Sequence, residues 1–259
     1  MNNNLIPFNY KDLSFFLDIK TGFIRQIKYR GIEVAQCIYA AVRDHKWGTV
    51  SGSLYDLKVR QESDHLHISF KYHATNISII NCLKNLKTLK PFFKSGGWKP
   101  IDYTYRLTIR VTEEDQEAAM SLLFEGSAGC DFLSNRVGFC VLHPLAENIG
   151  SSCLITRSDG TKKRGVFPEL ISAGQVFKEI RQMRIYSFYD YAFEFSGEIF
   201  ETEDQRNWTD ASFKTYCRPL EEPFPFLVKK GVRMEQAVRL SISKKSGRKK
   251  QQGGFKKKY

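Results

Sequence analysis

The sequence predicts an all-β protein built as a large antiparallel β-sandwich. Apolar residues take every even position in residues 65–73 and every odd position in residues 103–111, and this period of two is typical of a strand with one solvated face. Turn signals separate many similar short segments, and no helix of three turns stands out. A chain of 259 residues has the length of one large sandwich or of two smaller domains.

The expected strands are short apolar or alternating segments between turn residues. In chain order they are 13–19, 22–29, 32–42, 54–60, 65–73, 103–111, 118–126, 132–142, 152–157, 184–196, 197–202, 224–229 and 233–242. The best candidate for a short helix runs from Val176 to Met183. Residues 81–100 are rich in lysine and contain Pro and Gly-Gly, which predicts a long basic surface loop.

One domain is expected over residues 5–242, followed by a disordered basic tail over 243–259. The alternation stops after Ile242, and the tail holds eight Lys and Arg residues and no acidic residue, a composition that cannot build a core. Removing those eight charges from the net charge of +12 leaves +4 for residues 1–242. Because a basic tail gives only salt-dependent, nonspecific affinity, no specific nucleic-acid partner is expected.

Several function classes lose support from what the sequence lacks. There is no signal-peptide pattern and no apolar window of membrane-spanning length, so no membrane partner is expected. Six cysteines without C-x-x-C spacing indicate free thiols in a reducing cytoplasm. Phosphate-binding glycine loops, G-x-S-x-G and H-E-x-x-H are missing. No cofactor and no metal is expected, and the histidines of 65–73 are interpreted as a plain exposed face.

The densest polar run, residues 201–216, fits neither a strand nor a helix period and predicts a loop. Carboxylates and amides such as those of Glu203, Asp204 and Asn207 suit the hydroxyl groups of a polyol. Arg206 and Lys214 can neutralise an anion, and Trp208 offers a ring for stacking. A solvated turn with charge pairs is the alternative, and composition alone favours it.

Two further runs supply candidate site residues. In Asn135 to Pro144, Arg136 and His143 lie seven apart, which puts them on opposite faces of a regular strand unless a bulge intervenes. His143 is a candidate general acid or base because histidine titrates near neutral pH, although a histidine at a strand end is more often structural. In Arg43 to Thr49, charges around Trp47 suit either a pocket lining or a surface turn.

Six segments together resemble one known family. They are RDHKWGT, NRVGFCVLHP, FPELIS, QVFKEIR, EDQRNWTDASFKTY and RPLEEPFPF, and in this order they resemble the N-terminal domain of bacterial D-apionate lactonases, over residues from about 13 to 242. The resemblance implies a β-supersandwich fold like that of aldose mutarotases, and hydrolysis of D-apionolactone to D-apionate in apiose catabolism. Family members continue into a TIM-barrel-like domain and a small β domain, so it also implies a truncated member.

Two function hypotheses follow, both with a sugar lactone or sugar acid as the small-molecule ligand. In the first, the chain is a lactone hydrolase: Glu203 or Asp204 is the base, Arg206 and Arg136 hold the oxyanion or carboxylate, and His143 is the acid. The residues expected to position the substrate are Asn207, Trp208, Asp44, Trp47 and Lys214. In the second, the chain is a non-catalytic carbohydrate-binding or scaffolding sandwich that needs a separate catalytic domain or chain.

Overall fold

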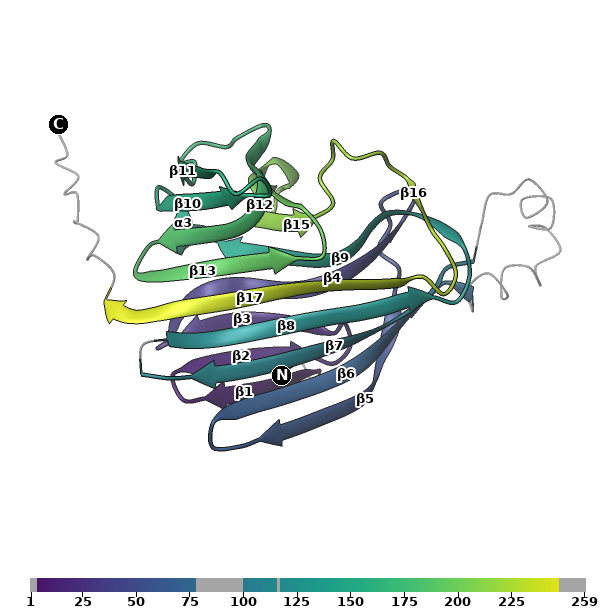
Figure 1. Cartoon of the computed structure of the whole chain (residues 1–259), viewed down its shortest axis with the longest axis horizontal. Coiled ribbons are helices and arrows are strands. Elements are labelled where there is room, and N and C mark those ends of the chain that lie inside the picture. Colours follow the sequence, from purple (N-terminus) through teal and green to yellow (C-terminus); the bar gives the residue numbers. More distant parts are fainter. Residues whose placement is uncertain (1–3, 78–99, 116, 247–259) are drawn as a thin grey trace.

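Antiparallel strands arranged in two layers dominate the computed structural model of the chain (Figure 1), which describes residues 4–77, 100–115 and 117–246. The first nine strands are β1 (Leu5–Tyr10), β2 (Leu13–Asp18), β3 (Phe23–Tyr29), β4 (Ile32–Asp44), β5 (Gly52–Gln61), β6 (His65–Thr75), β7 (Asp102–Glu113), β8 (Glu117–Ala128) and β9 (Phe132–Pro144). After the short helix α3 (Leu145–Asn148) come β10 (Ser152–Arg157), β11 (Lys162–Val166), β12 (Gln175–Tyr186), β13 (Tyr189–Ser196), β14 (Phe200–Asp204), the 3-10 turn η2 (Gln205–Trp208), β15 (Ser212–Cys217), β16 (Phe226–Val228) and β17 (Arg233–Ser246).

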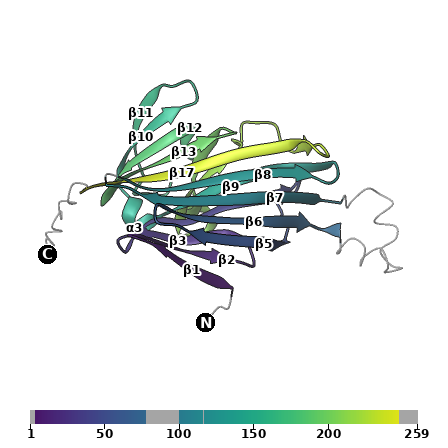
Figure 2. The same ribbon diagram turned by 60° about the horizontal axis from the view of Figure 1, so that its bottom comes forward.

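Strand β12 joins the two layers. One layer runs β5-β6-β7-β8-β17-β13, and the other runs β1-β2-β3-β4-β9-β15-β14. The C-terminal part of β12 pairs with β13 and its N-terminal part with β14, while β10 and β11 continue from its other edge. Figures 1 and 2 show β5 to β8 and β17 covering β1 to β4. The predicted antiparallel sandwich is confirmed.

The main core lies between the layers and follows the alternation read from the sequence. On β6 and β7 the residues at the predicted inward positions, such as Phe70 and Leu107, are buried, and their sequence neighbours are more exposed. Strands β4 and β9 are buried on both faces. On the outer face of their layer, Tyr39, Cys140 and Tyr216 belong to a second, smaller apolar cluster. The layer of β4, β9 and β15 is therefore the one with a closely packed outer surface.

The predicted helix from Val176 to Met183 is wrong, because these residues form part of strand β12. Their apolar positions are spaced three and four apart, as in a helix, but register shifts occur along the strand. Glu179 has a φ of 58°, so the backbone there leaves the extended conformation. Because of these shifts, Ile180 and Met183 are both buried on the same side of β12, although they are three residues apart.

The predicted loop over residues 201–216 is also wrong: it is the end of β14, the turn η2 and the strand β15. The predicted single strand 184–196 is divided by a turn between β12 and β13. The sequence reading also missed strands β1 and β11, and β17 continues to Ser246, four residues past the expected domain end. The predicted loop at 81–100 lies outside the described residues except for Pro100, and residues 247–259 of the predicted tail lie outside them.

Between β15 and β16 the edge of β9 lacks a neighbouring strand, and a side chain takes its place. β15 pairs with residues 140–144 of β9, and β16 pairs with residues 132–134. Across the gap, the amide of Gln236 on β17 donates to Val137 O at 3.0 Å and accepts from Phe139 N at 3.0 Å. Gly138 lies between these two groups with a φ of 133°, and a Cβ there would overlap the Gln236 amide. Gln236 therefore ties the two layers together.

Gly138→Ala is expected to lower the free energy of unfolding by about 2–4 kcal/mol, because it adds a strained backbone and displaces a buried, bonded amide. Gly160→Ala is the matched control: Gly160 also has a positive φ, of 83°, but nothing lies within 4 Å of its added Cβ. Its cost should be near 1 kcal/mol. Urea unfolding measures both, and equal losses would contradict the role given to Gln236.

Two further observations bear on the chain as a whole. In the described residues, no helix is long and apolar enough to cross a membrane. The five cysteines of this part, Cys37, Cys130, Cys140, Cys153 and Cys217, are free thiols. Burial raises the pKa of Cys37 to about 12 and that of Cys153 to about 12, so neither is disposed to form a reactive thiolate.

Candidate site on the outer face of β9, β14 and β15

Charged side chains gather on the outer face of β9, β14 and β15, next to the small apolar cluster. Five residues form this outer-face cluster: Arg136, Glu201, Glu203, Lys214 and Tyr216. The pairing places Glu201 opposite Tyr216 and Glu203 opposite Lys214, and Tyr216 opposite Cys140. Because residues two apart on a strand share a face, one period of two brings the β14 and β15 members of the cluster to the same side.

Tyr216 lies at the centre of the outer-face cluster. Its hydroxyl donates to Glu201 Oε1 at 2.7 Å, and the Lys214 Nζ lies 5.5 Å from its ring centre. The same Glu201 oxygen accepts the backbone N–H of Leu220 at 2.8 Å. Burial, followed by the nearby carboxylates of Glu203 and Glu201, raises the pKa of Tyr216, so its hydroxyl stays protonated and serves as a donor.

Glu203 and Lys214 form an ion pair within the cluster. Their side chains are 3.5 Å apart between Oε1 and Nζ and are 19% and 9% exposed respectively. Gln205 donates to the same Glu203 oxygen at 2.6 Å. Glu203 is therefore held in place by a cation and an amide, and it retains some contact with solvent.

Arg136, like Glu201, forms no ion pair among the described residues. Its residue is 3% exposed, and its guanidinium carbon lies 3.8 Å from the ring centre of Tyr216 and 5.2 Å from that of Trp47. Nε donates to Cys217 O at 3.1 Å. Among the described residues, no hydrogen bond or ion pair reaches its two terminal nitrogens. These two nitrogens are not among the fully buried polar atoms that lack a partner, so they retain contact with solvent. Guanidinium donors placed in this way suit a carboxylate or a polarised carbonyl oxygen.

The turn after β4 borders the cluster and carries Trp47. The ring of Trp47 lies 5.3 Å from that of Phe224, edge to face. Arg43 donates to Trp47 O at 2.7 Å and holds the residue at a φ of 67°. Asp44 Oδ1 accepts the backbone N–H groups of Lys46 and Gly48, both at 2.8 Å. Trp47 thus reaches the site, whereas Asp44 shapes the turn that presents it.

Asp204 faces the opposite side of β14 from Glu203, and Arg206 and Asn207 bind it there from the turn η2. Asp204 is 1% exposed, and Arg206 binds both of its carboxylate oxygens, at 2.9 and 2.7 Å. Burial raises the pKa of Asp204, but hydrogen bonds from Arg206 and from Ser172 N outweigh it and hold that pKa below its usual range. Arg206 and Asn207 also donate to backbone carbonyls of residues 168–172. These three residues therefore fasten the segment 168–172 to the turn η2.

His143 points into the core, on the face of β9 opposite to Arg136. Between these two residues the pairing of β9 with β4 continues without a shift, so the odd separation keeps them apart. His143 is fully buried beside Phe193, at 5.1 Å between ring centres, and its Nε2 lies 2.8 Å from Thr215 Oγ1. Burial lowers its pKa to about 3. Its ring is therefore neutral at ordinary pH and out of reach of solvent.

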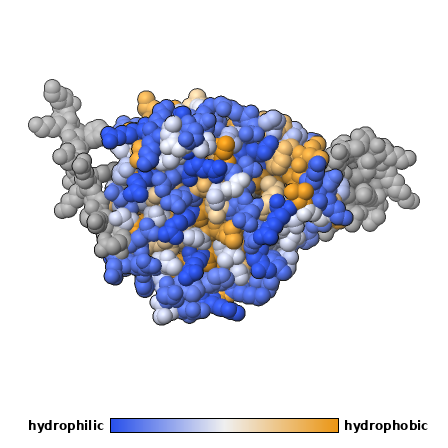
Figure 3. Space-filling view, viewed as in Figure 1, coloured by the Kyte–Doolittle hydropathy of each residue, from blue (hydrophilic) through white to orange (hydrophobic). Residues whose placement is uncertain are grey.

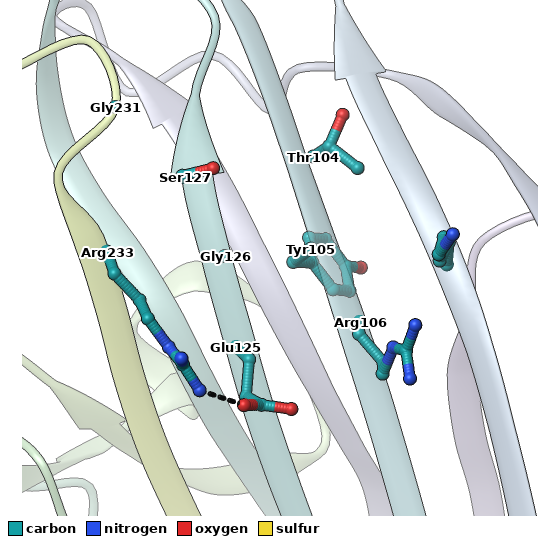
Figure 4. Close-up of a pocket in the computed structure, with 9 residues that line it drawn as sticks. Thr104, Tyr105, Arg106, Glu125, Gly126, Ser127, Gly231 and Arg233 are labelled. Carbon is teal, nitrogen blue, oxygen red and sulfur yellow. Dashed lines mark hydrogen bonds and ion pairs between the residues drawn. The ribbon is translucent and has the colours of Figure 1, made fainter.

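The other surface features lie apart from the outer-face cluster. A shallow depression of about 420 Å³ on β6, β7, β8 and β17 contains none of the predicted site residues, and Glu125 pairs with Arg233 there (Figure 4). The face shown in Figure 3 is mostly hydrophilic with scattered apolar spots. Glu62, Asp64 and His65 could together hold a metal ion; the two acids are exposed, and Asp64 Oδ1 lies 2.8 Å from His65 Nδ1.

Of the residues predicted from sequence, the structure brings four together: Arg136, Glu203, Lys214 and Trp47. Trp208 is 72% exposed on η2. The predicted residues that do not join these four are Asp44, His143, Asp204, Arg206, Asn207 and Trp208. Sequence reasoning missed Glu201 and Tyr216. The signal for both was present, since 201 and 203, and 214 and 216, are spaced by two.

Comparison with solved structures defines the class of fold. A galactose mutarotase-like protein from Lactobacillus casei superposes with a TM-score of 0.52 at 12% identity, covering 92% of this chain and 99% of that chain. The galactosidase domain of an alpha-galactosidase-sucrose kinase gives a TM-score of 0.54 at 8% identity, covering 95% of this chain and 41% of that one. At such identities the likeness concerns the fold alone, which is a mutarotase-like β-supersandwich.

Sequence comparison then gives the family. The model of the D-apionate lactonase N-terminal domain matches residues 9–87 and 93–245. The D-apionate lactonase of Brucella anthropi is 32% identical over an alignment of 234 residues, which covers 88% of this chain and 34% of that protein. The chain therefore belongs to the D-apionate lactonase N-terminal domain family, and it spans about a third of the length of this curated relative.

The buried His143 should make stability fall in acid. An unfolded histidine titrates near pH 6.5, whereas burial lowers the pKa of folded His143 to about 3. Between these two pH values the unfolded chain therefore binds one more proton than the folded chain. The contribution of His143 to stability is complete above pH 6.5 and is lost as the pH falls toward 3. Urea unfolding between pH 7 and pH 4 measures this dependence. The free energy of unfolding of His143→Gln should fall less steeply with decreasing pH than that of the wild type, by up to about 1.4 kcal/mol per pH unit. His45→Gln, at an exposed position, is the control and should keep the wild-type slope. Parallel pH profiles for wild type and His143→Gln would contradict a buried, neutral His143.

Arg206→Ala should destabilise the fold by about 3–5 kcal/mol, because it leaves the Asp204 carboxylate buried without its cation. Arg30→Ala provides the control: Arg30 pairs with Asp12 at 2.7 Å, but both side chains are well exposed, so the loss should be much smaller than that of Arg206→Ala. Chemical unfolding at neutral pH measures both variants. A similar, small loss for Arg206→Ala would show that it does not fasten the segment.

Proposed function

We propose that this chain binds a sugar lactone or sugar acid, of the D-apionolactone and D-apionate type, at the outer-face cluster. The observation that carries the proposal is the largely buried Arg136, whose terminal N–H groups retain contact with solvent and meet no acceptor among the described residues. A ligand carboxylate or carbonyl oxygen would accept charge-assisted hydrogen bonds from these donors, and such bonds are strong beside the apolar rings of Tyr216 and Trp47. Membership of the D-apionate lactonase family supplies the class of ligand.

The cluster has the groups that lactone hydrolysis needs. Glu203 would take a proton from water as the water oxygen attacks the lactone carbonyl carbon. The terminal nitrogens of Arg136 would stabilise the oxyanion that forms. The bond from that carbon to the ring oxygen then breaks, and the proton held by Glu203 passes to the ring oxygen, which becomes a hydroxyl. In this proposal the roles first given to His143 and Arg206 pass to Glu203 and Arg136.

The remaining members would hold the sugar. Glu201 has one oxygen fixed by Tyr216 and by the Leu220 amide, which leaves the other oxygen for a hydroxyl group. The ring of Trp47 would cover an apolar face of the ligand. Because the chain spans a third of its curated relative, a non-catalytic sugar-binding or scaffolding role alongside a separate catalytic polypeptide remains the second candidate. A reducing cytoplasm is the location we propose, since free thiols suit it.

Arg136→Met tests the binding proposal. The variant removes the charge-assisted hydrogen bonds but keeps much of the side-chain volume, so calorimetric titration with D-apionate should show affinity falling tenfold to a hundredfold, or about 1.5–3 kcal/mol. Arg136→Lys should retain part of the affinity. Arg25→Met is the matched control, because Arg25 also lies over an aromatic ring, that of Phe23, and already pairs with Asp18.

Acid release from D-apionolactone separates the two candidates. Hydrolysis that Glu203→Gln abolishes would support the enzyme. Binding of D-apionate without hydrolysis would leave the sugar-binding or scaffolding role. Failure of the wild-type chain to bind either compound, or unchanged affinity in Arg136→Met, would contradict the proposed site.

A further inference from the structure

Three large apolar side chains stand in solvent on two neighbouring segments. Leu170 is 85% exposed, Ile171 is 59% exposed and Trp208 is 72% exposed. A single exposed apolar residue is ordinary on a protein surface, but a group of them marks an interaction site. Large aromatic and aliphatic side chains are also the usual anchors of protein interfaces. We call these three residues the apolar rim.

The segments that carry the apolar rim are firmly fastened to each other. Arg206 donates to Pro168 O and Glu169 O, both at 2.9 Å, and to Leu170 O at 3.1 Å. Asn207 donates to Ser172 O at 2.5 Å. These bonds fix the backbone from 168 to 172 against the turn η2, on which Trp208 lies. The loop is therefore held with its apolar side chains outward.

This arrangement uses strong interactions to keep apolar groups in water. The Asp204 and Arg206 pair is buried and doubly bonded, and Ser172 N donates to Asp204 Oδ2 at 3.0 Å. Exposed apolar side chains gain nothing in the isolated domain from being held this way. A partner that covers them would bind with higher affinity, because anchors that are already rigid lose little conformational entropy on binding.

The sequence comparison indicates what kind of partner this is. In the Brucella anthropi D-apionate lactonase the matched region is 34% of the protein, so a domain of this family is joined there to twice its own length of further polypeptide. We propose that the apolar rim is the surface on which such a further polypeptide docks. The inference does not rest on sugar binding, because the apolar rim shares no residue with the outer-face cluster.

A chimera tests the docking directly. It carries the whole of this chain in place of the matched region of the Brucella anthropi enzyme, so the two parts are covalently joined and even a weak interface is populated. In calorimetric melting, replacing Leu170, Ile171 and Trp208 by Ser should lower the melting temperature of the sandwich by about 5 °C or more in the chimera. The same three changes in the isolated chain should shift it by less than about 2 °C, because these side chains are exposed in the described part of the chain.

Exposed apolar residues on another part of the molecule give the control. Tyr55→Ser and Val59→Ser, on β5, change side chains that are 44% and 46% exposed, and should leave the chimera unchanged. Equal melting of the chimera with and without the rim substitutions would overturn the proposal. So would sedimentation data in which the isolated chain is a dimer that the substitutions dissociate, since the occupant would then be a second copy. Sugar binding by Arg136 is measured separately, so either proposal can fail alone.

Discussion

The structure depends on strand β9 being buried on both faces. One face belongs to the core between the two layers, and the other to the closely packed outer surface. Alternation therefore assigns each side chain of β9 and its neighbours to one environment or the other, and a shift by one residue would exchange them. The Gln236 amide helps to hold this register where one edge of β9 lacks a neighbouring strand. His143 is consequently a core residue, and Arg136 belongs to the outer face.

The same constraint explains why the outer-face cluster is chemically unusual. Charges placed on a buried face need partners, and Glu203 finds Lys214 while Glu201 receives donors from Tyr216 and Leu220. Arg136 rests against aromatic rings and keeps two nitrogens without an acceptor in the described part of the chain. A donor that has no acceptor within the protein is a place where a ligand oxygen can bind.

The fold class could be predicted from sequence because β6 and β7 alternate without interruption. Strand β12 could not, since its register shifts turn a strand pattern into one with helical spacing. The site was predicted in part for a related reason. Glu203 and Asp204 are adjacent carboxylates, yet they face opposite sides of β14, and only the strand assignment separates a site residue from one that fastens a loop. Glu201 and Tyr216 were missed because residues 201–216 were interpreted as a loop without faces.

A crystal structure of the chain with D-apionate bound is the most direct test of this account. It predicts the ligand carboxylate within hydrogen-bond distance of the terminal nitrogens of Arg136, with the sugar hydroxyls toward Glu201 and Glu203 and the ring of Trp47 alongside. A ligand found instead in the depression beside Arg233, or at Arg206, with Arg136 left untouched, would contradict it.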